Sequence, residues 1–156
     1  EVKQGEIAVI VGPNGAGKST AMKALLGMLK LTDGSVSFAE DDISGMLEYL
    51  TEDITWDHGG NDYTPESPIN KLWEGKSGAQ SFFETLSDTQ DVLAHDVHEF
   101  FTSENKVAVT GFYKGRVKKT GKEFSSDWAQ VWEFENGLAK AWKLTFNFTA
   151  EALAYK

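Results

Sequence analysis

The pattern of apolar and polar residues changes near residue 40. Residues 6–11 are almost entirely apolar and β-branched, which predicts a strand buried on both faces. A glycine-rich stretch follows, and then apolar residues at helical spacing predict a helix over 21–30 and a short strand over 35–38. This order predicts a strand–loop–helix–strand unit at the start of the chain.

Residues 41–156 have a different texture, with short helices followed by long strands. The spacing predicts helices over 43–50 and 77–86, a strand over 54–58 and a loop over 59–70. Alternation predicts four further strands, over 92–102, 107–118, 124–135 and 138–148. Asn136 and Gly137 predict a type I′ hairpin turn, because both central residues of that turn need a positive φ. Consecutive antiparallel strands after helices predict an α+β fold with helices on one face of a curved sheet.

The glycine-rich stretch matches the pattern G-x-x-x-x-G-K-[ST] between a predicted strand and a predicted helix. Backbone N–H groups of such a loop converge on one point beside a helix N-terminus, which favours an anion. Lys18 would reach the outer phosphates, and the Ser19 hydroxyl would hold Mg²⁺ on the nucleotide. ATP or phosphate with Mg²⁺ is therefore the expected cofactor, and an inert surface turn is the alternative. The predicted phosphate-binding residues are Gly12, Asn14, Gly15, Ala16, Gly17, Lys18, Ser19 and Thr20.

Residues 5–44 resemble the opening of an ABC-transporter ATPase domain, over about a quarter of the chain. This resemblance identifies the loop as a Walker A motif. The later parts of that family, a Walker B Asp-Glu pair, a Q-loop and a switch His, have no counterpart in the sequence. Residues 77–80 resemble the ABC signature only superficially. We therefore expect nucleotide or phosphate binding without efficient hydrolysis, and no competent ATPase.

Residues 45–156 resemble the nuclear transport factor 2-like (NTF2-like) superfamily, and within it the SnoaL-like polyketide cyclases and ketosteroid-isomerase-like proteins. The resemblance is carried by residues 47–56, 73–76 with Phe82 and Phe83, 121–132, 135–137 and 142–150. It implies a cone-shaped fold, in which a strongly bent, mostly antiparallel sheet surrounds a pocket closed by helices. We expect the P-loop segment, residues 1–44, to pack onto the body, residues 45–156, as one integrated domain.

Alternation also predicts which side chains face that pocket. Ile54, Trp56 and His58 share one face of their strand. The predicted lining residues are Trp56, Trp128, Gln130, Trp132 and Asn147. The resemblance implies a carboxylate base near the end of the first strand, and His58 falls closest to that position. A neutral imidazole can serve as a base, so His58 is the catalytic candidate. The alternative is that Trp56, Trp128 and Trp132 form core and that His58 is a hydrogen-bonded rim residue, which are the commoner roles of these residue types.

Two further residue groups near these candidates are predicted to be structural. Glu52 and Asp53 are expected to end a helix in a surface turn. His95 and His98 lie three residues apart on a predicted strand, hence on opposite faces, so they do not form a metal pair.

Charge and composition restrict the kinds of partner and the location that can be expected for the chain. The chain carries 15 basic and 24 acidic side chains, and residues 41–104 hold 15 of the acidic ones and only 2 basic ones. Such an acidic region repels phosphate backbones, and Arg116 is the only arginine, so nucleic acid is not an expected partner. The absence of cysteine excludes thiol chemistry and favours a reducing compartment. The expected location is therefore cytoplasmic, or recombinant only if the chain is engineered. No apolar run predicts a membrane span.

Three functional hypotheses follow. The chain is an engineered or recombined chimera whose P-loop binds phosphate or a nucleoside triphosphate; or it is a small-molecule pocket protein of the polyketide cyclase or isomerase type; or it is a scaffold without a selected function. The expected partners are a nucleotide or phosphate, a small apolar ligand in the cone, and a second copy of the chain.

Overall fold

The computed structural model describes residues 43–59 and 64–156. Within them, six strands form one sheet in the order β2-β1-β6-β5-β4-β3. Strands β1 and β6 run parallel, and every other neighbouring pair is antiparallel. The strands are β1 (Leu50–Asp57), β2 (Leu72–Glu74), β3 (Gln90–Ser103), β4 (Lys106–Val117), β5 (Glu123–Glu135) and β6 (Leu138–Thr145). This mixed, mostly antiparallel sheet confirms the predicted α+β fold class.

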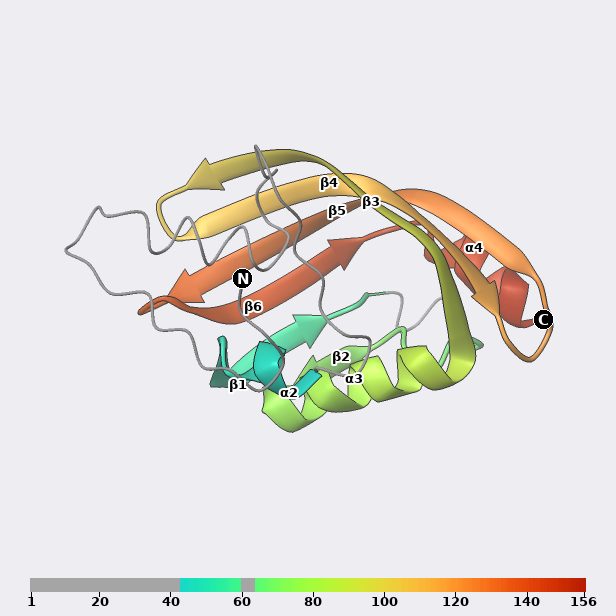
Figure 1. Ribbon diagram of the computed structural model, residues 1–156, viewed down its shortest axis with the longest axis horizontal. Helices are drawn as coiled ribbons and strands as arrows, with labels where there is room; N and C mark the ends of the chain where they lie inside the picture. The colour runs from blue at the N-terminus through green and yellow to red at the C-terminus, as the bar shows by residue number, and fades with distance from the viewer. Residues whose placement is uncertain (1–42, 60–63) are drawn as a thin grey trace, which may run out of the picture. The chain divides into compact units, whose positions relative to one another are not determined.

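Long β3, β4 and β5 curve strongly along their length (Figure 1). Register shifts in β3, between Val92 and Ala94 and between Val97 and Glu99, mark places where the ladder is irregular. Such bulges bend a strand and increase its twist. The curvature leaves one face of the sheet concave.

Three helices accompany the described part of the sheet: α2 (Ile43–Leu47), α3 (Gly75–Thr89) and α4 (Phe148–Tyr155). In Figure 1, α3 runs beneath β1 and β2, and α4 lies at the far end of the sheet. Helix α3 presents an apolar stripe because Ala79, Phe82, Phe83 and Leu86 recur at the i, i+3, i+4, i+7 spacing. Ala79 and Phe82 are buried in the core, and Phe83 and Leu86 pack against it.

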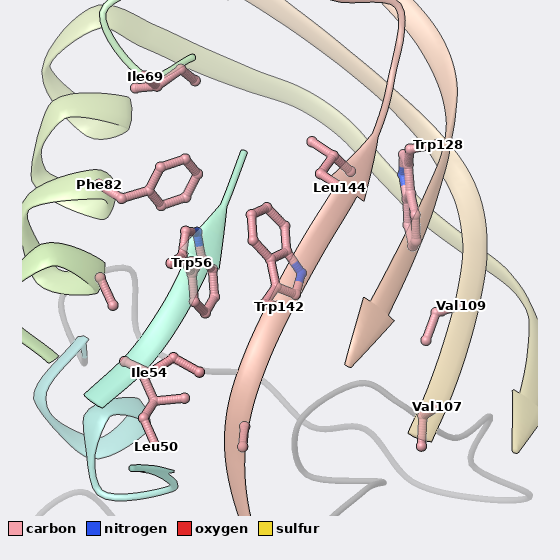
Figure 2. Close-up of a cluster of buried hydrophobic side chains, with 12 residues drawn as sticks. Leu50, Ile54, Trp56, Ile69, Phe82, Val107, Val109, Trp128, Trp142 and Leu144 are labelled. Atoms are coloured by element: carbon pink, nitrogen blue, oxygen red, sulfur yellow. The ribbon is translucent and has the colours of Figure 1, made fainter. Parts of the chain in front are cut away.

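The core lies between α3 and the concave face. Alternate residues of β1, Ile54 and Trp56, are buried, as are Trp142 and Leu144 of β6. Figure 2 shows Phe82 of α3 and Trp56 of β1 on the same side of the sheet as Trp142. The period-two prediction for these strands is therefore confirmed.

The hairpin between β5 and β6 is also confirmed. Asn136 has a φ of 51° and Gly137 a φ of 85°, which are the left-handed conformations that the turn requires. The four long strands occur where alternation predicts them, except that β6 ends at Thr145 rather than at residue 148.

The structure differs from the predicted elements in three regions. Helix α2 ends at Leu47, and β1 begins at Leu50, so Glu52 and Asp53 lie in a strand and not in a turn after a helix. Strand β2, inside the region between the predicted loop and the second helix, was not predicted. Residues from Phe148 form α4 because the Asn147 side chain accepts a hydrogen bond from the Ala150 N–H at 3.0 Å and caps a new helix.

Candidate functional site

His58 lies directly after β1, on the concave side of the sheet. Its side chain is only 6% exposed. The imidazole is surrounded by aromatic rings, with ring centroids 5.0 Å from Phe82, 6.0 Å from Trp142 and 5.7 Å from Phe148. Asp57 points the other way, as alternation predicts, and its Oδ2 lies 3.4 Å from the Lys143 Nζ.

A buried loop fixes the orientation of His58. Asn70 is 5% exposed, and its Oδ1 lies 2.9 Å from the His58 Nδ1. The Asn70 Nδ2 in turn donates to the Thr64 Oγ1 at 2.9 Å. Because an amide oxygen only accepts, the His58 Nδ1 must carry the proton. The neutral imidazole is thereby held with its lone pair on Nε2, which has no hydrogen-bond partner among the described residues.

The protonation state of His58 follows from its surroundings. Burial lowers the pKa of His58 to about 4, and the hydrogen bond to Asn70 and the charge of Asp57 offset only part of that effect. At neutral pH the ring is therefore uncharged and able to accept a proton without first losing one.

A second polar cluster lies on the inner side of α4. Glu151 is 1% exposed, and its Oε1 accepts a hydrogen bond from the Gln90 Nε2 at 2.7 Å. The Tyr113 hydroxyl donates to the Gln90 Oε1 at 3.1 Å, and the Gln90 Nε2 also donates to the Tyr155 hydroxyl at 2.9 Å. The second carboxylate oxygen, Oε2, has no hydrogen-bond partner in the described part of the chain.

The two clusters meet at the loop before β2. Burial raises the pKa of the Glu151 carboxyl, and the neighbouring Gln90, Asn70 and Ser67 side chains counter part of that increase. Asn70 thus lies close to Glu151 as well as to His58. A carboxyl group and an imidazole are therefore both buried at this end of the concave face, on either side of one asparagine.

Glu151, Asn70 and Gln90 were not among the sequence-predicted site residues. A glutamate between alanines in a helical segment usually faces solvent, and an asparagine in a loop rich in glycine and proline usually makes a turn. The Ala150–Ala154 stretch of good helix formers was the only signal that could have placed Glu151 on a helix.

The tryptophans predicted to line the interior are close to one another on the concave face. Trp56 stacks on Trp142 with centroids 4.3 Å apart, and its ring lies 5.6 Å from that of Trp132 in an edge arrangement. Trp128 is 5% exposed, and its ring lies parallel to that of His95 at 5.1 Å. Figure 2 shows Trp56, Trp142 and Trp128 in succession from the α3 side of the sheet toward β5.

The other residues that the sequence predicts for the site are Gln130, Asn147 and the phosphate loop. Gln130 is half-buried on β5, in register with Leu144. Asn147 is exposed and caps α4, so its side chain serves the helix and does not join the concave interior. The predicted phosphate loop, Gly12–Thr20, and the helix predicted over 21–30 lie outside the described residues.

An open hollow of ≈ 480 Å³ lies over strands β3 to β6. Thr110, Ala129 and Thr145 are cross-strand partners in one row. By alternation this row faces away from Trp132 and Trp142, whereas Gly111 and Trp128, which also line the hollow, are cross-strand partners in the adjacent row that faces the concave side. It is lined by His98, Thr110, Gly111, Asp127, Trp128, Ala129, Thr145 and Phe146.

The fold and the site can now be set beside known proteins. A family model described as a SnoaL-like domain matches residues 35–142. The chain belongs to the SnoaL-like family. This SnoaL-like chain is also similar to a solved NTF2-like protein from Burkholderia xenovorans LB400, with 25% identity, a TM-score of 0.66, and coverage of 74% of this chain and 84% of the other.

Two further solved structures share the fold. An NTF2-like protein from Burkholderia thailandensis E264 is 18% identical with a TM-score of 0.65, and covers 73% of this chain and 85% of its own. TerC, co-crystallised with polyporic acid, is 18% identical with a TM-score of 0.60, over 72% of this chain and 85% of its own.

Curated relatives include ATP-binding proteins of import and uptake systems. The hemin import ATP-binding protein HmuV of Rhodopseudomonas palustris (strain HaA2) is 54% identical over 43 residues, which are 28% of this chain and 16% of that protein. The zinc uptake ATP-binding protein ZnuC of Bacillus subtilis (strain 168) is 30% identical over 91 residues, 56% of this chain and 38% of its own length. The chain thus spans well under half of these relatives.

The described part of the SnoaL-like chain contains neither a helix that could span a membrane nor a cluster that could hold a metal ion. None of its helices is long and apolar enough to span a membrane. Residues 43–59 and 64–156 contain no group of three His, Asp or Glu side chains close enough to hold a metal ion.

Proposed function

We propose that the chain binds a small, largely apolar molecule in the concave interior and that His58 accepts a proton from it, in a reaction of the isomerase or cyclase type. The observation that carries this proposal is the fixed tautomer of His58, whose Nδ1 donates to Asn70 and whose Nε2 remains a free acceptor. The aromatic surroundings of His58 supply the apolar walls. The SnoaL-like family and the TerC structure with polyporic acid support binding of a small molecule.

The reaction would proceed by proton transfer alone. The His58 Nε2 removes a proton from a carbon beside a carbonyl group, which leaves an imidazolium and an enolate. The imidazolium then returns the proton to another carbon, and the double bond moves. Because the pKa of His58 is about 4, its conjugate acid is strong and returns the proton readily. The same value makes His58 a weak base, so the substrate needs an activated C–H bond.

A β,γ-unsaturated ketone tests this proposal, because its conversion to the conjugated isomer is followed by ultraviolet absorbance. We expect the protein to accelerate the conversion and His58→Gln to remove the acceleration. His98→Gln is the matched control, since His98 is exposed on β3. The rate should fall on acidification with a midpoint near pH 4, the pKa of His58, rather than near pH 6.5. Equal rates for wild type and His58→Gln would refute the role of His58.

A second candidate function is phosphate or nucleotide binding by the loop at 12–20. The full Walker A pattern and the 54% identity to HmuV over 43 residues favour it. In that case the chain joins an ABC-type N-terminal segment to a SnoaL-like body, as an engineered or recombined chimera would. Lys18 and Ser19 would hold the phosphates and Mg²⁺.

Calorimetric titration with ATP, GTP and inorganic phosphate tests this second candidate. We expect weak binding that Lys18→Ala abolishes, and affinities for ATP and GTP within about tenfold of each other. Equal heats for wild type and Lys18→Ala would contradict it. Phosphate release above the buffer background that Ser19→Ala removes would show hydrolysis, which we do not expect.

A further inference from the structure

Three buried tryptophans of the concave face have unused hydrogen-bond donors. Trp56, Trp128 and Trp142 are 3%, 5% and 5% exposed. Within the described residues, the Nε1 of each has no hydrogen-bond partner. Trp73 differs, because its Nε1 donates to the Ile69 carbonyl at 3.2 Å. Buried donors in folded proteins are nearly always paired, so three unpaired indoles on one face call for an acceptor that the described chain does not provide.

The three indoles belong to one surface. They come from β1, β6 and β5, which are neighbours in the sheet. Figure 2 shows them in succession on the concave side, with Leu144 between Trp142 and Trp128 and with Val109 of β4 nearby. Their surroundings are apolar side chains of the core. A ligand that contacts this surface therefore meets apolar side chains and the N–H groups of the three indoles.

The chemistry of the donors restricts the ligand. An indole N–H only donates, so its complement is an oxygen that accepts, such as a carbonyl or a carboxylate. The buried polar side chains of the described residues are His58, Thr64, Ser67, Asn70, Gln90 and Glu151, and none of them is a lysine or arginine. A carboxylate placed there would lack a buried counter-ion among the described residues, in a chain of net charge −9. The acceptor is therefore a neutral oxygen.

We propose that Trp56, Trp128 and Trp142 determine specificity by donating hydrogen bonds to the carbonyl oxygens of a neutral, planar ligand. This inference rests on the proposed function, because it places the ligand in the same concave interior as His58. It assigns recognition of the ligand oxygens to the indole nitrogens and leaves proton transfer to His58. An enolate formed at the ligand would be stabilised by the same donors.

Two naphthalenes of similar size and shape test the donors. 2-Acetylnaphthalene carries one carbonyl oxygen, and 2-ethylnaphthalene carries no acceptor. Each is titrated into the full ¹⁵N-labelled chain while the five indole N–H signals are followed by NMR. We expect 2-acetylnaphthalene to shift signals of Trp56, Trp128 or Trp142 downfield, as hydrogen bonding does, and to leave that of Trp73 in place. Trp→Phe variants assign the signals, since phenylalanine keeps an aromatic ring and removes the donor.

Affinities complete the test. Trp142→Phe or Trp128→Phe should weaken the binding of 2-acetylnaphthalene by about three- to tenfold, the effect of losing one neutral hydrogen bond, and leave that of 2-ethylnaphthalene unchanged. Equal affinities and equal indole shifts for the two compounds would overturn the donor role, with bound water as the partner of the indoles, while the interior pocket would stand. Binding of neither compound would overturn ligand binding in the concave interior, and with it the proposed function. The wild-type shifts decide the question even if a variant fails to fold.

Discussion

Acidification should lower the free energy of unfolding through His58, because burial lowers the pKa of this residue in the folded state. The unfolded chain has a histidine pKa near 6.5, and the folded chain holds that of His58 at about 4. The unfolded state therefore binds the proton first as the pH falls. The stabilising contribution of neutral His58 is complete above pH 6.5 and is lost as the pH falls toward 4.

The size of the effect follows from the two pKa values. The full difference between 6.5 and about 4 corresponds to about 3 kcal/mol, at 1.36 kcal/mol for each tenfold change in proton affinity. Between pH 7.5 and pH 5, linkage predicts that His58 alone lowers the free energy of unfolding by about 2 kcal/mol. Other groups titrate in this range, and Glu151 changes stability in the opposite direction. Only a comparison with a variant isolates His58.

Urea unfolding of wild type, His58→Gln and His98→Gln at pH 7.5, 6 and 5 provides that comparison. The free energy of unfolding of wild type and His98→Gln should fall about 2 kcal/mol further on acidification than that of His58→Gln. His58→Gln can lower stability at every pH without affecting the test, because the pH slope is the readout. Parallel slopes for all three proteins would show that His58 is solvated or charged in the folded state, and the reasoning from its burial would be wrong.

Three other changes have predicted outcomes. Burial raises the pKa of Glu151, so its stabilising contribution is present below the unfolded pKa and is lost as the pH rises. In urea unfolding, Glu151→Gln should therefore be about 1–3 kcal/mol more stable than wild type at pH 8. It should lose that advantage in acid. Gly111→Ala should cost about 1–3 kcal/mol, because a Cβ there would fall on the Trp128 ring and the Asp96 carbonyl; an unchanged thermal midpoint would contradict this close approach. Leu25→Ala and Leu26→Ala test whether the N-terminal segment is integrated with the body. At least one of them should lower stability by about 2–5 kcal/mol in thermal melts followed by tryptophan fluorescence. Two unshifted melts would contradict integration.

Much of the fold was predictable because most of its signals are local. Alternation along β5 and the positive φ of Asn136 and Gly137 depend on a few neighbouring residues. Helix α4 was not predictable in this way. Leu144, Phe146 and Phe148 continue the alternation of β6, so the pattern extends the strand. The observed end of β6 and the Asn147 cap depend on where the chain turns in the folded protein, which alternation does not encode.

The candidate site was predictable only in part, for a related reason. His58 was found because strand periodicity fixes its face. Its partner Asn70 lies 12 residues away in a loop, and no periodic signal shows that a loop asparagine is buried. Glu151 lies 61 residues from Gln90. Contacts of this kind are set by the path of the whole chain, so a single sequence cannot reveal them.

The buried polar groups indicate that this end of the interior is not arranged for stability alone. Burial shifts the pKa of both His58 and Glu151 toward the neutral form, which means that the folded state disfavours the charge of each group. An apolar residue of similar size would avoid that cost at either position. Functional sites are where such costs concentrate, because a poised proton acceptor must be partly desolvated and held in one orientation. His58 meets both conditions through Asn70, and in the proposed site the unpaired indole N–H groups would donate to the oxygen of a bound ligand. The chemistry proposed for this interior therefore depends on the same buried polar groups that make it energetically costly.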